Sequence, residues 1–236
     1  MNPPPGLPER HVVVPWPTAL LAMAMFTLPM TGCMTSRVEE SKNSATGIGE
    51  GESVVILAAS YHRGTAAEED FVSCVAEEVQ HGRDGVPVIP ERQFTDALFP
   101  WFEPRTAPRS AAALPELLAR PGVAERIEQH GIRYVVWLDG NTERTNGGGS
   151  LSCAIGPGGG GCFGLTWWED DASYDAAVWD LKQQSDAGTV SADVHGTSMI
   201  PALLIPVPLI ARTQSAACKD LARELRGFIT GAGPLT

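Results

Sequence analysis

Basic residues are scarce in this sequence. Its 236 residues include 17 lysines and arginines against 28 aspartates and glutamates, so the formal net charge is −11. A chain of this charge has no general attraction to phosphate backbones, and nucleic acid is therefore not expected as a partner. Hydrophobic residues make up 43% of the chain, which is enough for a packed core and excludes wholesale disorder.

Sequence motifs of catalysis and nucleotide binding are also missing. The chain has no Gly-x-x-x-x-Gly-Lys-Ser/Thr loop, no Gly-x-Ser-x-Gly elbow and no His-Glu-x-x-His. The glycine-rich stretches 147–149 and 156–161 do not lie between a strand and a helix, so they predict a hairpin tip and not a phosphate cradle. Three consecutive carboxylates at 169–171 predict a solvated turn and not a calcium site. We assign no catalytic residue, metal or cofactor from the sequence.

The apolar run near the N-terminus is too short for a membrane-spanning helix. As a helix, residues 18–28 would extend about 16 Å, roughly half of a bilayer core. This length is typical of the apolar region of a signal peptide. The sequence Leu-Pro-Met-Thr-Gly-Cys at 28–33 follows directly and resembles the lipobox of bacterial lipoproteins. The resemblance implies a signal peptide over 1–32 and an acylated Cys33 as the first residue of the mature protein.

Two features of this segment differ from the lipoprotein pattern. Met30 stands where leucine is usual, and the single Arg10 of the amino-terminal region is offset by Glu9. The alternatives are an ordinary signal peptide with an incidental cysteine, or a buried apolar helix. By the same resemblance, Met34 is not the aspartate that favours retention in the inner membrane. We therefore expect a lipid-anchored protein of the outer membrane that faces the periplasm, with the inner membrane as the less favoured location.

Residues 33–52 are predicted to be a lipidated cysteine followed by a flexible tether. They show no periodicity and almost no bulky apolar side chains, and a random coil of this length reaches about 25 Å. A single periplasmic domain is expected over 53–231, with a short tail at 232–236.

The domain is predicted to be α/β, and more narrowly α+β. Apolar runs at 53–59, 86–90 and 132–138 predict early parallel strands that alternate with helices. Later segments at 162–168 and 172–181 predict an antiparallel hairpin around the acidic turn, before a last helix that begins at Thr213. The expected architecture is a mixed sheet with helices mainly on one face.

This order of elements resembles a group of periplasmic proteins. The group contains the penicillin-binding-protein activator lipoproteins, the curli-secretion lipoprotein and the amino-terminal domain of TolB. The local features that look similar are Gly131–Trp137 and Val178–Leu181 followed by Gly188. The resemblance is topological and covers roughly 53–231. It implies a membrane-anchored, non-catalytic interaction or assembly module that binds another envelope protein.

A lipid-anchored periplasmic hydrolase is the alternative function. Its site would not be visible in the sequence, and Ser60, Tyr61 and His62 at the end of the first strand are one set that could form it. The tryptophans are the candidate residues for contact with a partner. Trp167 and Trp168 are adjacent on a predicted strand and must point to opposite faces, so one of them could be exposed and contact a partner. Helices that cover both faces are the other possibility.

Four cysteines follow the proposed anchor, and disulfides are the default in an oxidising compartment. Cys153 and Cys162 flank the glycine-rich loop, which can bend back. Cys74 and Cys218 lie on the apolar stripes of the first and last predicted helices. The favoured pairings are therefore Cys153–Cys162 and Cys74–Cys218. The alternatives are two free buried cysteines, or a zinc site, for which the spacing is unsuitable.

Overall fold

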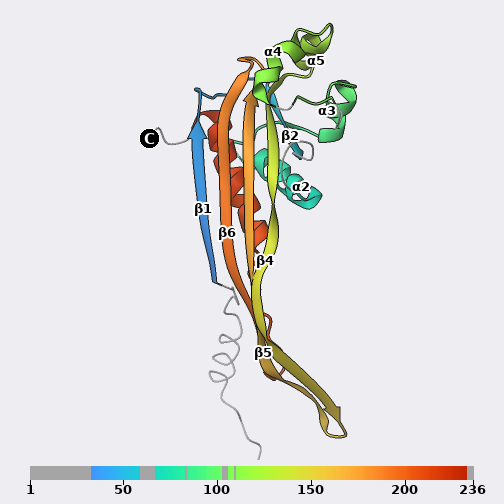
Figure 1. Ribbon diagram of the computed structural model, residues 1–236, viewed down its shortest axis with the longest axis vertical. Coiled ribbons are helices and arrows are strands. Elements are labelled where there is room, and N and C mark those ends of the chain that lie inside the picture. The colour runs from blue at the N-terminus through green and yellow to red at the C-terminus, as the bar shows by residue number, and fades with distance from the viewer. Residues whose placement is uncertain (1–32, 59–66, 83, 103–105, 109, 233–236) are drawn as a thin grey trace, which may run out of the picture. The chain divides into compact units, whose positions relative to one another are not determined.

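The computed structural model describes residues 33–58, 67–82, 84–102, 106–108 and 110–232 (Figure 1). The signal peptide expected at 1–32 and the set Ser60, Tyr61 and His62 lie outside the described residues. The elements follow in this order: β1 (Cys33–Lys42), β2 (Ser53–Ala58), α2 (Glu69–Gln80), β3 (Val88–Ile89), α3 (Glu91–Ala97), a 3-10 turn (Ala111–Ala113), α4 (Leu114–Leu118), α5 (Val123–Gln129), β4 (Ile132–Gly156), β5 (Gly159–Asp180), β6 (Ser185–Leu204) and α6 (Thr213–Thr230).

One mixed sheet holds all six strands, in the order β1-β6-β5-β4-β2-β3. Strand β2 pairs in parallel with β3 and β4, and the helices between these strands provide the crossovers that parallel pairing requires. The remaining pairs, β4–β5, β5–β6 and β6–β1, are antiparallel. The α+β fold with early parallel and later antiparallel strands is thus confirmed.

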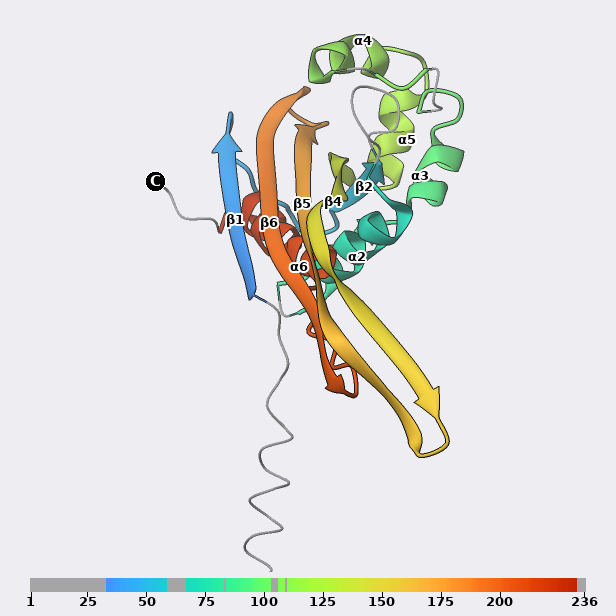
Figure 2. The same ribbon diagram turned by 60° about the horizontal axis from the view of Figure 1, so that its bottom comes forward.

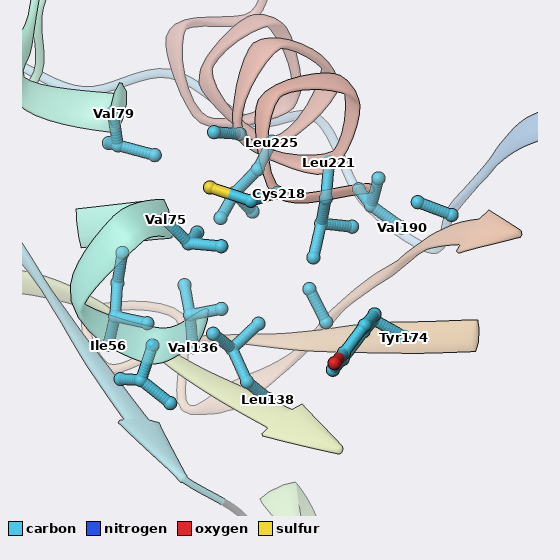
Figure 3. Close-up of a cluster of buried hydrophobic side chains, with 14 of the residues drawn as sticks. Ile56, Val75, Val79, Val136, Leu138, Tyr174, Val190, Cys218, Leu221 and Leu225 are labelled. Atoms are coloured by element: carbon cyan, nitrogen blue, oxygen red, sulfur yellow. The ribbon is translucent and has the colours of Figure 1, made fainter. Parts of the chain in front are cut away.

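Helices α2 and α6 cover one face of the sheet and form the larger core with it. Figure 3 shows Leu221 and Leu225 of α6 above Val136 and Val190 of the sheet, and all four side chains are buried. Each such aliphatic side chain contributes roughly 1.5–3 kcal/mol when fully buried. The Cys74–Cys218 disulfide joins the two helices. We refer to the face covered by α2 and α6 as the helix face.

A second core lies on the opposite face, under the short helices α3, α4 and α5. It contains Phe94, Leu114 and Ile127 from the helices, packed on Val135 and Trp137 of β4. These helices cover only the part of the sheet near β2. The rest of this face, which we call the open face, carries no helix among the described residues.

The tether predicted over 33–52 is wrong for its first half, because residues 33–42 form strand β1. They pair with β6 over the full register from Cys33↔Thr197 to Lys42↔Gly188. An edge strand is held mainly by backbone hydrogen bonds and needs few apolar side chains. The apolar pattern from which strands are predicted is therefore weak in this segment. Only Val38 packs against the core, while Ser36 donates a hydrogen bond to Asp220 of α6. Residues 33–42 therefore belong to the sheet of the domain, although they precede residue 53.

The hairpin predicted around 169–171 is also wrong, since β5 runs without a break from Gly159 to Asp180. The three carboxylates lie inside the strand, where successive side chains point to opposite faces. The hairpin turn lies instead between Gly156 and Gly159, which is where the glycine-rich stretch predicts a tip. Strands β4 and β5 consequently extend far beyond the ends of α2 and α6 (Figure 2).

Candidate functional site

The part of the sheet that extends beyond the helices contains no charged residue. None of residues 145–168 and 196–211 is acidic or basic, although charged residues make up 19% of the whole chain. These two segments comprise the distal halves of β4 and β5, the end of β6 and the return that follows β6. We call them together the charge-free end. Such a surface is unusual in an acidic protein and marks this end as the candidate site.

The open face of the charge-free end carries a set of apolar side chains in three rows. Residues paired directly across antiparallel strands point to the same face, so the register fixes which side chains are neighbours. The rows are Phe163↔Leu203, Leu165↔Pro201 and Trp167↔Met199. We call these six residues the apolar ladder. Phe163 is 72% exposed and Leu203 is 80% exposed, which is far outside the range of core residues.

Cys33 lies in the row that follows the apolar ladder. It pairs with Thr197, which in turn pairs with Glu169 of β5. By the same rule its side chain is on the open face, and it is exposed and not in a disulfide. The sequence alone separates Cys33 from Trp167 by more than a hundred residues, whereas the sheet brings the two into neighbouring rows.

The two tryptophans point to opposite faces, as expected for adjacent strand residues, and both are partly exposed. Trp167 on the open face lies over Gly148, where an added Cβ would meet the indole ring at 3.5–3.7 Å. Trp168 on the helix face donates a hydrogen bond from Nε1 to Asp170 at 2.9 Å, and the Arg144 guanidinium lies 5.0 Å from its ring centre. Trp168 is therefore held by charged neighbours, and Trp167 is not.

The hairpin is closed near its tip by the Cys153–Cys162 disulfide, which joins directly paired residues of β4 and β5. Both disulfides in the structure have the pairings that the sequence favours. Glycines occupy much of this end of the β4–β5 hairpin, so few side chains can pack there. The disulfide therefore holds the two strands together near the tip.

The exposed edges of β1 and of the distal part of β4 differ in their protection. The outer edge of β1 carries exposed charges at Arg37 and Glu39. On β4, the Thr142 N–H donates to the Glu68 carboxylate at 3.2 Å. Beyond this point, β4 residues 145–156 have no strand on their outer side in the described part of the chain, and none of them is charged or proline. Natural proteins usually protect a free edge with charge or proline, so this one is open to pairing.

Above the Cys33 row, the open face becomes polar. His195 and Asp171 are paired across β6 and β5, and His195 Nδ1 is hydrogen-bonded to the Asp171 carboxylate. This hydrogen bond and the Asp171 charge raise the pKa of His195, and Glu169 adds a smaller contribution in the same direction.

We expect Asp171→Asn to lower the pKa of His195, and Glu169→Gln to lower it less. Because the pKa in the folded protein is raised, this pair stabilises the protein below the pKa of histidine in the unfolded chain. That contribution is lost as the pH rises through the pKa of the folded protein. A titration of the His195 ring followed by NMR measures the pKa in each variant. An unchanged pKa in Asp171→Asn would show that Asp171 does not control it.

A cavity of about 690 Å³ between α2, β3 and α3 is the other candidate for a site. Burial raises the pKa of Glu91 at its rim, and the nearby charge of Glu69 adds to the effect. Ser73 and Thr95 contribute hydroxyl groups to its lining, and no histidine, cysteine or lysine is among the described residues that line it. The Thr95 hydroxyl donates to the backbone carbonyls of Glu91 and Arg92.

Within the described ranges, no group of three or more His, Cys, Asp or Glu side chains could hold a metal ion. No helix of these residues is long and apolar enough to cross a bilayer.

The tryptophans and cysteines of this site can be identified in the sequence, whereas the apolar ladder was not predicted. The signal was present as apolar residues at alternate positions 163, 165 and 167 within a segment without charge. The partner residues on β6 fall in a segment with three prolines, which the sequence predicts to be extended but not paired. Which residues share a row depends on the register, and this information is not local.

Comparisons with known proteins give little beyond the structure itself. No family model and no curated protein matches the chain. Among solved structures, two of PelC from Paraburkholderia phytofirmans are similar, each determined as a dodecamer, and one of them carries a single substitution. Their identities to this chain are 12% and 11%, with TM-scores of 0.36 and 0.38. Both alignments cover 83% of this chain, and 98% and 99% of the PelC chains. At these values nothing about this protein is inferred from the likeness.

Proposed function

We propose that this protein is a lipoprotein of the bacterial envelope that acts as a non-catalytic assembly module. In this proposal it is anchored in the outer membrane by an acylated Cys33 and binds another envelope protein with the β4–β5 hairpin. The observation that carries the proposal is the free edge of β4 over residues 145–156, which lies beside Trp168 and has neither charge nor proline.

Strand addition is the binding mode that this edge supports. An extended segment of a partner can pair with the free N–H and C=O groups of β4, and neighbouring side chains then provide selectivity. Exposed Leu151 and Ile155 lie on the helix face of β4, in line with Trp168. A partner strand along β4 would cover all three side chains. The Cys153–Cys162 disulfide reduces the entropy that the hairpin loses when it binds.

Photo-crosslinking in intact cells tests this proposal. With a photoreactive residue in place of Ile155, we expect capture of one defined envelope protein. The same residue in place of Thr35 on the charged edge of β1 is the matched control and should capture little.

A charge on the β4 edge should abolish the interaction. Leu151→Lys places an ammonium group on the helix face, among the side chains that a partner strand would cover, and an unpaired charge buried in an interface costs several kcal/mol. We therefore expect capture through position 155 to fall at least tenfold. Thr35→Lys adds the same charge to the β1 edge and should leave capture unchanged.

Trp168→Ala should lower the same capture by removing the aromatic side chain beside the edge. If neither Leu151→Lys nor Trp168→Ala changes the captured protein, this edge is not the contact surface. Hydrolysis of a substrate panel that one point mutation abolishes would instead support the enzyme.

A further inference from the structure

We propose that the apolar ladder is a lipid-contacting surface. It lies at the hydrated interface of the leaflet that holds the acyl chains of Cys33. This inference rests on the proposed anchor and extends it, because it fixes how the domain is oriented at the membrane. It concerns the open face of the charge-free end, whereas the proposed protein contact uses the edge of β4 and the helix face.

The position of Cys33 selects a bilayer as the occupant. Because β1 is paired from its first residue, no flexible segment separates an acyl group on Cys33 from the sheet. The Cys33 side chain points to the same face as the apolar ladder and lies one row away from Trp167 and Met199. Neighbouring rows on one face of a strand are about 7 Å apart. An anchored Cys33 thus brings the apolar ladder to the headgroup region without further rearrangement.

The charge pattern on the open face agrees with this orientation. On β5 and β6 the three rows beyond Cys33 are apolar, and on β4 they continue with the uncharged Gly148, Ser150 and Ser152. The rows before Cys33 are polar, beginning with the Asp171–His195 pair and continuing with Ser173 hydrogen-bonded to Asp193. The change from charged to apolar therefore takes place at the level of Cys33. Trp167 occupies the first apolar row, next to Cys33, and tryptophan is enriched at membrane–water interfaces.

The backbone limits the depth of insertion. Strand β4 presents unpaired N–H and C=O groups at its free edge, and such groups are not tolerated in the hydrocarbon core. The sheet must therefore lie with its open face on the leaflet, so that the side chains of the apolar ladder enter while the backbone stays in the hydrated interface. From the Cys33 row to Leu203 this contact extends about 20 Å.

Quenching by brominated phospholipids tests the orientation of the acylated protein. The protein is reconstituted into phosphatidylethanolamine and phosphatidylglycerol vesicles with bromine near the top of the acyl chains. We expect the lipid to quench part of the tryptophan emission, and Trp167→Phe to remove most of the quenchable part. Trp137→Phe, in the core under α3 to α5, is the control and should leave the quenching unchanged. Quenching that is absent, or that persists in Trp167→Phe, would overturn the proposal.

A second measurement is independent of acylation. The mature Cys33→Ser protein, exported with a leader that the ordinary signal peptidase removes, is mixed with the same vesicles and sedimented. We expect binding that hardly changes with salt, because the charge-free end offers no ionic attraction. Phe163→Ser combined with Leu203→Ser should lower the partition coefficient at least tenfold. Ile155→Ser removes an even more exposed apolar residue from the opposite face and should have little effect.

The outcomes separate this inference from the proposed anchor. Absence of a fatty acid on Cys33 contradicts the anchor, while vesicle binding that depends on Phe163 and Leu203 still supports the lipid-contacting surface. If the double variant changes the sedimentation coefficient in the absence of vesicles and the parent protein does not bind vesicles, the apolar ladder joins two copies of this chain. That result would overturn the inference.

Discussion

A double variant with Cys74→Ala and Cys218→Ala is expected to lose up to about 5 kcal/mol of unfolding free energy. The disulfide joins α2 to α6 across 144 positions of the chain, and a loop of this length has a large closure entropy in the unfolded state. About 5 kcal/mol is the value of the chain-entropy model, and removal of native disulfides typically costs 2–5 kcal/mol. Since whole domains are stable by only about 5–15 kcal/mol, this variant should be near the limit of folding.

The hairpin disulfide provides the matched control. Cys153 and Cys162 are nine positions apart, and closing such a loop contributes about 2.7 kcal/mol in the same model. Urea unfolding of the oxidised proteins gives both free energies. We expect Cys153→Ala with Cys162→Ala to be clearly the milder change. A larger loss in the hairpin variant would show that the Cys74–Cys218 bridge does not stabilise the packing of α2 on α6.

Cys33→Ser is expected to transfer the protein from the membrane fraction to the soluble periplasm. Three acyl chains hold a mature lipoprotein, and each buried CH₂ group adds about 0.8 kcal/mol, so attachment through them is stable. Without them, only the apolar ladder can contact lipid, and that contact should be weak and reversible. Fractionation of cells that export the mature variant with an ordinary cleavable leader measures the change. Wild-type protein in the soluble fraction would contradict the anchor.

Most of the parallel strands and the last helix could be predicted from the sequence. Continuous β-branched runs such as Ser53–Ala58 and the apolar stripe of α6 are local patterns, and both elements were predicted close to their observed bounds. The strand predicted at 86–90 is observed as β3 (Val88–Ile89), and it lies at the edge of the sheet, where Pro87 is tolerated. These elements are buried, and buried segments can be recognised in a sequence because they consist of apolar residues. Their positions along the chain could therefore be predicted.

The antiparallel half was harder to predict for a physical reason. In β1 and in the distal parts of β4 and β5, backbone pairing holds the strands, and few of their side chains are buried. Glu169, Asp170 and Asp171 look like a turn in the sequence, but within β5 they alternate between the two faces, and Asp170 binds Arg144 and Trp168. The candidate site was the hardest part to predict, because Cys33 and the apolar ladder become neighbours only through the register of β1, β6 and β5.

Acylation of Cys33 is the claim on which the membrane orientation and the proposed location depend. Growth of the producing bacterium with a fatty-acid analogue, followed by mass analysis of the amino-terminal peptide, tests it directly. We expect a mature chain that begins at Cys33 and carries the analogue on this residue. A mature chain that begins elsewhere, or an unmodified Cys33 in the membrane fraction, would contradict it.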